Sequence, residues 1–194
     1  MAFEEYEILL ASGKCKGQFS SDNASWKINP DYVLIISGTG TSGDYYGDDL
    51  HPWLAYQDKI VKVVLEEGIT SAGMYSFTNM VSLAEVVLPS TLWSIDQQAF
   101  HNCPSLTSIT IPAATKYLRE RCFGDWYITG SEYDYNYFYL TNVVFERTSG
   151  WTHRDPLNSS DSVSVLASQL QNPADAAEML RNHFNRYFVN TEAS

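Results

Sequence analysis

Short apolar stretches alternate with turn-forming residues along the chain, and no apolar run approaches the length of a membrane-spanning helix. Apolar positions within residues 26–28 and 33–36 flank the turn-forming Asn29-Pro30-Asp31, which predicts a β-hairpin. The glycine-rich residues 38–43 that follow predict a loop. The pattern favours a chain of short strands and turns, with no insertion into a membrane.

An internal repeat organises the middle of the chain. Residues 69–89 and 92–112 align at an offset of 23 with six identical positions. The identities are Ser71/Ser94, Phe77/Phe100, Asn79/Asn102, Ser82/Ser105, Leu83/Leu106 and Pro89/Pro112. Five further positions exchange one apolar residue for another. Matches concentrated at apolar positions indicate that the same packing unit is used twice.

The repeat extends in both directions. Apolar residues within 60–65 lie 23 positions before those of 83–88, which predicts the closing strand of an earlier unit. In the other direction Phe123 lies 23 positions after Phe100. The Leu-x-x-apolar-x-apolar pattern returns at 140–145, at a shift of 34, so the third unit carries 11 extra residues. Insertions of this kind project as loops from one side of a repeat array.

Each unit is too small to bury both of its faces, so neighbouring units must stack. Within one unit, Leu83, Val86 and Leu88 are expected to point inward from a short strand that ends at Pro89. The following turn or short helix should place its Phe in the core. The amides of Asn79 and Asn102 are expected to satisfy backbone groups at that bend.

The C-terminal part combines a loop and a helix. The Ser-, Asp- and Asn-rich residues 152–162 predict a loop. Asn172 followed by Pro173 predicts a helix start, and apolar residues at helical spacing continue this helix through Phe188. The predicted fold is a β-rich α+β chain, a short solenoid with a hairpin cap at its N-terminal end and a helix cap at its C-terminal end. The expected parts are residues 1–57, the repeats at 58–150, and 151–194.

The repeated pattern resembles the BspA-type leucine-rich repeat. The resemblance rests on Phe77-x-Asn79-x-x-Ser82-Leu83-x-x-Val86-x-Leu88-Pro89 and its second copy ending at Pro112. The segment 26–53 resembles the hairpin module that often precedes such repeats, and 150–151 with 172–180 resembles the segment that often follows them. The resemblance implies a leucine-rich-repeat solenoid and a non-catalytic recognition protein, displayed extracellularly or on a cell surface for adhesion, that binds protein or glycan ligands.

Charge and the N-terminal sequence modify this expectation. The chain has 12 Lys and Arg against 23 Asp and Glu, a net charge of −11, which excludes nucleic acid as a partner. Its first residues carry acids where a secretory signal would carry Lys or Arg, so no signal peptide is expected in this chain. A short chain without leader or anchor leaves a second possibility open. It could be a structural, decorating or host-attachment subunit of a phage virion or another large particle, and homo-oligomers are possible.

The inserted segment supplies the candidate binding residues. Seven of the fourteen residues at 126–139 are aromatic, and Tyr residues alternate with other residues from 133 to 139. An extended segment would place these phenols on one face, where they suit protein interfaces and sugar stacking. The alternative, slightly favoured, is that the rings cover the core. The candidate binding residues are Trp126, Tyr127, Tyr133, Tyr135, Tyr137 and Tyr139.

No other sequence pattern predicts a catalytic, metal-binding or cofactor-binding site. The acidic residues 43–49 lack the spacing of a calcium loop, which favours a solvated turn. The four His residues form no metal spacing and are expected to be solvated or hydrogen-bonded. Of the three Cys residues, Cys103 aligns with Met80 and is expected to be a buried apolar thiol. No catalytic motif occurs, so the sequence predicts no enzyme, no metal site and no cofactor.

Overall fold

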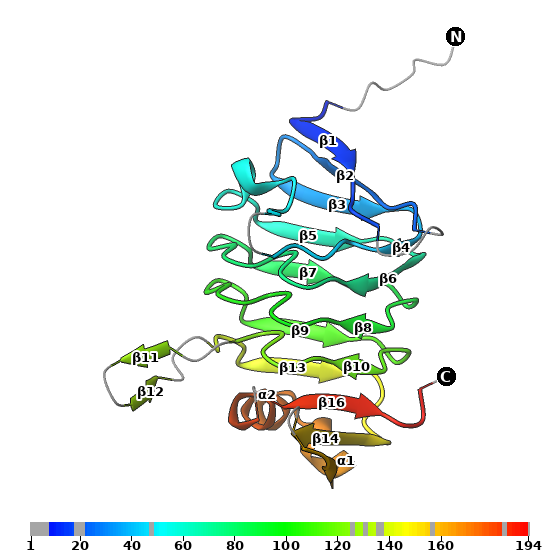
Figure 1. Ribbon diagram of the computed structural model, residues 1–194, viewed down its shortest axis with the longest axis vertical. Helices are drawn as coiled ribbons and strands as arrows, with labels where there is room; N and C mark the ends of the chain where they lie inside the picture. Colours follow the sequence, from blue (N-terminus) through cyan, green and yellow to red (C-terminus); the bar gives the residue numbers. More distant parts are fainter. Residues whose placement is uncertain are drawn as a thin grey trace.

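Two large sheets and two strand pairs make up the described β-structure, and the two large sheets run side by side along the stack (Figure 1). One sheet has the strand order β1-β2-β3-β5-β7 and the other the order β15-β14-β16-β10-β8-β6-β4. Strands β9 and β13 form a pair, as do β11 and β12. The computed structural model describes residues 8–17, 22–46, 49–124, 127–129, 132–134, 138–155, 158–183 and 186–193.

The strands are short, and the helices are few. In the N-terminal half the elements are β1 (Ala11–Lys14), β2 (Ser25–Ile28), β3 (Val33–Ser37), β4 (Gly40–Thr41), the 3-10 helix η1 (Leu54–Tyr56), β5 (Lys62–Leu65), β6 (Ile69–Ala72), β7 (Glu85–Val87) and β8 (Ser94–Ile95). In the C-terminal half they are β9 (Ser108–Ile111), β10 (Tyr117–Leu118), β11 (Tyr127–Thr129), β12 (Glu132–Asp134), β13 (Asn142–Phe145), β14 (Trp151–Asp155), β15 (Asn158–Ser164), α1 (Ala167–Gln171), α2 (Pro173–Asn182) and β16 (Tyr187–Asn190). The expected β-rich chain is therefore confirmed.

The predicted N-terminal hairpin is present, since β2 and β3 pair antiparallel. Its turn is held by Asn29, whose side-chain oxygen accepts the backbone N–H groups of Asp31 at 3.1 Å and Val33 at 2.9 Å. The glycine-rich segment that follows was expected to be a loop throughout. Its residues Gly40 and Thr41 instead form β4, because they pair in parallel with β6.

Parallel pairing follows the repeat period. Ser71 of β6 lies opposite Ser94 of β8, and Ser94 lies opposite Tyr117 of β10, each a step of 23 residues. Asn142 of β13 lies opposite Ser108 of β9, which confirms the step of 34. The chain between β10 and β13 includes the β11–β12 hairpin, which Figure 1 draws to one side of the stacked strands.

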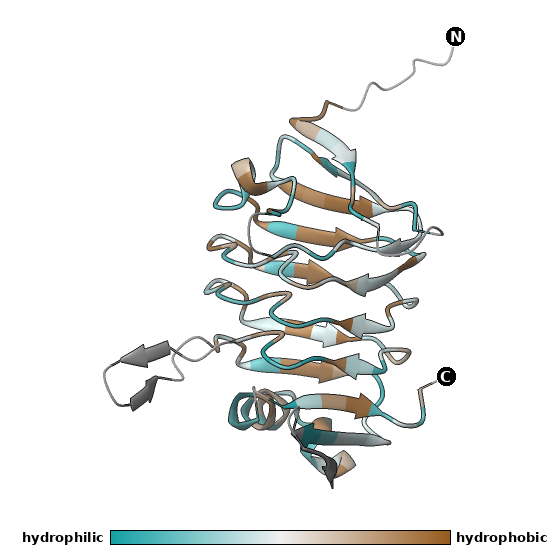
Figure 2. Ribbon diagram, in the orientation of Figure 1, coloured by the Kyte–Doolittle hydropathy of each residue, from teal (hydrophilic) through white to brown (hydrophobic). Residues whose placement is uncertain are grey.

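A column of stacked rings fills the centre of the stack. The ring centroids of Phe77 and Phe100 lie 5.1 Å apart, and those of Phe100 and Phe123 lie 6.0 Å apart, as the repeat predicted. Two further rings extend the column: Trp53 lies 5.7 Å from Phe77, and His51 lies 5.5 Å from Trp53. Apolar residues of the strands belong to the same buried cluster. Figure 2 shows hydrophobic positions recurring in successive strands of the stack. The column links successive units, so each depends on the next for burial.

The repeated asparagines have a different role from the one expected. Asn79 and Asn102 both adopt left-handed backbone angles, with φ of 58° and 52°. Asparagine tolerates this conformation better than most residues with a side chain. The Asn102 amide donates to the Asn79 side-chain oxygen at 2.8 Å, so the two side chains bond to each other across adjacent units.

Two predictions for the C-terminal region are wrong. Residues 152–162 were expected to form a loop, but β14 and β15 pair antiparallel there. The predicted helix begins as expected, with the Asn172 side chain accepting the N–H groups of Ala174 and Asp175, but it ends at Asn182. Residues 187–190 form β16 because pairing with both β10 and β14 satisfies their backbone groups and buries Phe188.

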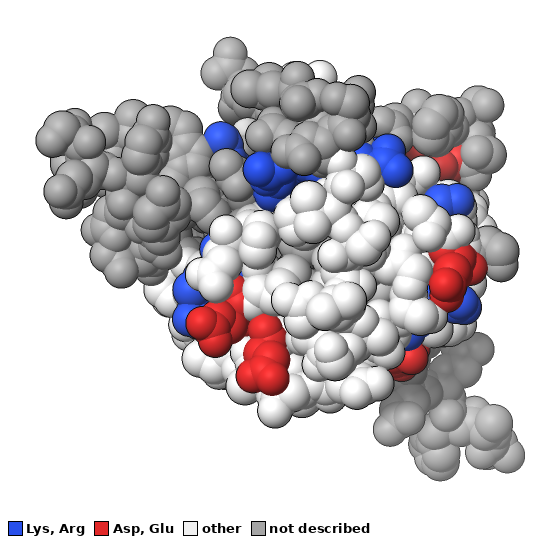
Figure 3. Space-filling model, turned by 90° about the horizontal axis from the view of Figure 1, so that it is seen from below, with Lys and Arg blue, Asp and Glu red and all other residues white. Residues whose placement is uncertain are grey.

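Within its described part, the C-terminal end of the stack exposes a largely uncharged surface. Charged side chains lie around its margin, whereas uncharged side chains occupy the middle (Figure 3). Val163 and Leu166 belong to the segment around β15 and α1 and are 45% and 64% exposed. No helix among the described residues is long and apolar enough to cross a membrane.

Candidate binding groove

The predicted aromatic binding segment is only partly described. Trp126, Tyr135 and Tyr137 lie outside the described residues. Tyr127 belongs to β11 and lies one pair away from Tyr133 of β12 in the antiparallel pairing. The side chains of these two residues also lie outside the described part of the structure. The structure therefore leaves the proposed cluster of phenols as a prediction.

The end of that segment packs against the stack. Phe138 is half-buried against the hydrophobic core, and the Arg181 guanidinium of α2 lies 5.6 Å from its ring centroid. Tyr139 is half-buried as well. The Phe138 ring therefore covers part of the core, whereas the role of Tyr139 in binding stays a prediction.

A groove over the second sheet offers a described candidate site. It has a volume of about 590 Å³ and lies over β4, β6, β8 and β10. Beneath it, the repeat positions 72, 95 and 118 carry the buried apolar residues Ala, Ile and Leu. The outward repeat positions carry unlike residues instead: Thr70, Trp93 and Lys116 in one row, and Gly73, Asp96 and Arg119 in another. One scaffold therefore holds a varied surface.

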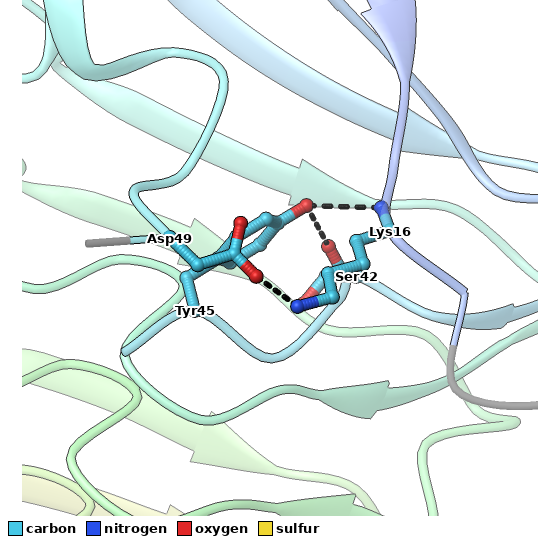
Figure 4. A network of polar contacts seen from close by, with 4 residues as sticks. All are labelled: Lys16, Ser42, Tyr45 and Asp49. Atoms are coloured by element: carbon cyan, nitrogen blue, oxygen red, sulfur yellow. Dashed lines mark hydrogen bonds and ion pairs between the residues drawn. The ribbon is translucent and has the colours of Figure 1, made fainter. Parts of the chain in front are cut away.

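The N-terminal wall of the groove is a tethered loop. Tyr45 is buried, accepts the backbone N–H of Lys16 at 3.1 Å, and donates to the Ser42 carbonyl oxygen at 3.2 Å. Lys16 also forms an ion pair with Asp49 (Figure 4). Burial raises the pKa of Tyr45 to about 12, so the phenol stays protonated. The expectation of a solvated turn at 43–49 is therefore wrong at Tyr45.

This tether places Asp44 in the groove. Asp44 directly precedes the buried Tyr45, and its Oδ1 accepts the backbone N–H of Met74 at 2.8 Å. The expected absence of a calcium loop at this segment rests on the sequence spacing. Among the described residues, no group of three or more His, Cys, Asp or Glu is arranged to hold a metal ion.

The floor of the groove is a short chain of hydroxyl groups ending at a carboxylate. Ser94 Oγ donates to Ser71 Oγ at 3.1 Å, and Ser71 Oγ donates to Asp96 Oδ2 at 2.5 Å. Burial raises the pKa of the Asp96 carboxyl, and hydrogen bonds from Ser71 and Ser94 oppose this rise. Arg119 Nε lies 3.9 Å from Asp96 Oδ1, at the limit of an ion pair.

Rings and cations alternate along one side of the groove. The Lys116 ammonium lies 4.8 Å from the Trp93 ring centroid. The Arg119 guanidinium lies 4.6 Å from the Tyr117 centroid and 5.9 Å from that of Tyr187. Trp93 is 38% exposed, so the groove keeps an accessible aromatic surface. These contacts favour noncovalent binding of a ligand that has polar or charged groups.

Neither His nor Cys is among the described lining residues of this groove. Cys103 is buried as predicted, and burial raises its pKa to about 12, so its thiol stays protonated. His51 is 4% exposed, so it is not solvated, but its side chain is hydrogen-bonded to Gln57, which fits the expectation of a solvated or hydrogen-bonded His; its Nδ1 has no partner. Its ring is buried because it stacks on Trp53.

Sequence reasoning missed the groove because its rings and charged side chains vary between units, although Ser71 and Ser94 on its floor are identical repeat positions. Alignment at 23 residues emphasises identical and apolar positions, whereas Trp93, Asp96 and Arg119 stand where the other units have different residues. The same alignment nevertheless contained a signal that could have indicated the outward face of the repeats. Positions that vary beside a constant apolar row mark the outward face of a repeat.

Comparison with known proteins identifies the repeat. Residues 54–154 match the family described as the BspA type leucine-rich repeat region (6 copies). The chain belongs to this BspA-type leucine-rich repeat family. The matched range begins at η1 and ends within β14, so this BspA-type region contains the stacked rings of Phe77, Phe100 and Phe123 and the parallel-paired strands β5, β6, β7, β8, β9, β10 and β13. No curated protein matches the chain.

Two solved leucine-rich repeat proteins illustrate how similar this BspA-type chain is to known structures. A leucine-rich repeat protein from Eubacterium ventriosum ATCC 27560 is 26% identical, with a TM-score of 0.53. The alignment covers 72% of this chain but 41% of that one, so the chain spans less than half of that relative's length. A leucine-rich repeat protein from Bacteroides capillosus ATCC 29799 is 18% identical with a TM-score of 0.39, covering 67% of this chain and 97% of that one.

Proposed function

We propose that the chain is a non-catalytic recognition module that binds a protein or glycan partner through the groove over β6, β8 and β10. The observation that carries this proposal is the contrast between the two sets of repeat positions. Inward positions repeat apolar residues, whereas the outward positions around Trp93 and Asp96 present rings, hydroxyls and charges over a hollow of about 590 Å³. A rigid stack that holds varied side chains suits recognition.

The proposal includes architecture and location. The stacked strands would act as a short solenoid, closed by the hairpin module of 1–57 at one end and by the 151–194 segment with its helix at the other, around the repeats of 58–150. Display on a cell surface for adhesion follows from the family resemblance. The aromatic segment 126–139 would add a second contact area.

A defined array tests the binding proposal. The purified chain is applied to immobilised oligosaccharides and to immobilised peptides, and we expect it to be retained on a subset of them. Trp93→Ala should lose most of this retention, because it removes an accessible ring from the groove. Replacing Tyr135 and Tyr137 by Ser should weaken retention without unfolding the protein, which circular dichroism checks.

A matched control uses the β9–β13 pair. Val144 on β13 is 37% exposed, similar to Trp93, and lies outside the groove lining. We expect Val144→Ser to bind as the unmodified chain does. Absence of retention on every spot, or equal retention by the Trp93→Ala variant, would contradict the groove as the binding site.

A second candidate function is a subunit of a virion or other large particle. The uncharged C-terminal end with exposed Val163 and Leu166 favours it, because exposed apolar groups at the end of a stack suit contacts between copies. This candidate predicts self-association in sedimentation equilibrium that Leu166→Asp reduces. The recognition module predicts a monomer at all concentrations, unchanged by the same substitution.

A further inference from the structure

The groove is unevenly charged. Among the described residues, its lining includes the carboxylates of Asp22, Asp44, Asp96 and Glu120 and the guanidinium of Arg119, and the Lys116 ammonium lies over the lining ring of Trp93, so acids outnumber bases by four to two. Field lines from carboxylates that share a hollow reinforce one another, so the groove attracts cations and repels acidic ligands. Phosphorylated or uronic-acid ligands therefore fit it poorly.

The Asp96 carboxylate is placed to attract a cation from a ligand. Its side chain is 25% exposed, and the Arg119 contact at 3.9 Å is long for an ion pair. The hydroxyl of Ser71 donates to one of its oxygens. A half-buried carboxylate with one long ionic contact gains more from a second cation than a surface carboxylate does, since less water competes.

Arg119 shows what kind of group the groove accommodates. Its guanidinium lies over the Tyr117 ring and beside the Asp96 carboxylate, so one cation contacts a ring and an acid together. Trp93 offers a further ring that is exposed in part. A Lys or Arg side chain from another molecule would meet the same combination of ring and carboxylate.

We propose that the groove binds a basic segment of a partner polypeptide, with a Lys or Arg side chain of that partner seated against Asp96 and the neighbouring rings. This names the partner class of the proposed recognition module and rests on that function. Neutral oligosaccharides would use the rings and hydroxyls but would bring no second cation to Asp96. The charge of the lining therefore favours the basic peptide.

Three labelled peptides test the proposal. Fluorescein-labelled Gly-Lys, Gly-Ser and Gly-Glu repeats of equal length are titrated with the full chain, and binding is followed by fluorescence anisotropy. We expect binding of the Lys peptide alone, weakening as NaCl rises from about 50 to about 500 mM because salt screens the attraction. Asp96→Asn should weaken binding roughly tenfold, as loss of one charge-assisted contact does.

Two further variants separate a local site from the overall charge. Glu85→Gln removes the same charge from β7 of the other sheet, and we expect less than about a twofold change because that site lies outside the groove. Arg119→Ala should strengthen binding, because it removes the internal cation that competes for Asp96. A merely structural role of Arg119 predicts weaker binding instead.

The outcomes distinguish this inference from the function on which it rests. Equal weakening by Asp96→Asn and Glu85→Gln, or weaker binding by Arg119→Ala, would overturn the basic-segment proposal. So would retention only on neutral oligosaccharides or acidic peptides in the array, although the recognition function would then stand. Failure to bind any spot would remove the recognition function itself.

Discussion

Phe100→Ala is expected to lower the free energy of unfolding by about 4 kcal/mol, in the range for removing a buried aromatic side chain. Phe100 is 1% exposed and stacks between Phe77 and Phe123, with centroid separations of 5.1 and 6.0 Å. The substitution leaves a cavity in the middle of the column and removes ring contacts on both sides. Urea unfolding followed by circular dichroism measures the change.

The matched control is an exposed ring. Tyr46 is 63% exposed, so Tyr46→Ala should change the free energy of unfolding by less than about 0.5 kcal/mol. If Phe100→Ala lowers the free energy of unfolding by less than about 1 kcal/mol, the result would contradict the column, because removing a ring packed on both faces costs more than that.

The second large effect is a loss of stability in mild acid that depends on His51. Burial lowers the pKa of His51 from 6.5 to about 4, and a hydrogen bond with Gln57 opposes this shift. Between these values the unfolded chain binds a proton at this residue and the folded chain does not, so stability falls as the pH falls. The contribution of His51 is fully present above pH 6.5, and about 3 kcal/mol of it is lost by pH 4.

His51→Phe isolates this term because phenylalanine keeps a ring on Trp53 but has no proton to bind. Urea unfolding at a series of pH values between 7 and 4 is compared for the two proteins. We expect the variant to lose less stability than the unmodified chain, with the difference growing as the pH falls. If the free energy of unfolding falls equally with pH in both proteins, His51 binds a proton equally in the folded and unfolded chains. That result would contradict the lowered pKa of the buried ring.

Much of the fold could be predicted because a repeat transfers information from one unit to the next. The identical Phe77 and Phe100 predicted a third ring at Phe123, and the shift of 34 correctly placed β13 beside β9. Local signals were sufficient for the hairpin turn at Asn29 and for the helix start at Asn172. In each case the side chains that make the contact are adjacent in sequence or one period apart.

The failures occurred where distant pairing overrode local pattern. Apolar spacing continued the final helix to Phe188, but β10 and β14 supply strand partners that no local window contains. Trp53 lies 24 rather than 23 residues before Phe77, so the period hid its place in the column. The polar composition of 152–162 masked β14 and β15, where pairing satisfies the backbone.

The candidate site was harder to predict than the scaffold. Recognition surfaces use the positions at which repeats differ, and a single sequence provides no rule for what those positions carry. Asp44 reaches the groove through the tether of Tyr45 to Lys16, a contact between residues 29 positions apart. The aromatic segment 126–139 stood out by composition, and its role in binding stays a prediction.

The stacking of successive units is tested most directly by ring-to-ring nuclear Overhauser effects in protein with isotope-labelled phenylalanine. With centroids 5.1 and 6.0 Å apart, we expect cross-peaks between Phe77 and Phe100 and between Phe100 and Phe123, both lost in Phe100→Ala. Resolved, assigned rings without these cross-peaks would contradict a chain whose units share one interior.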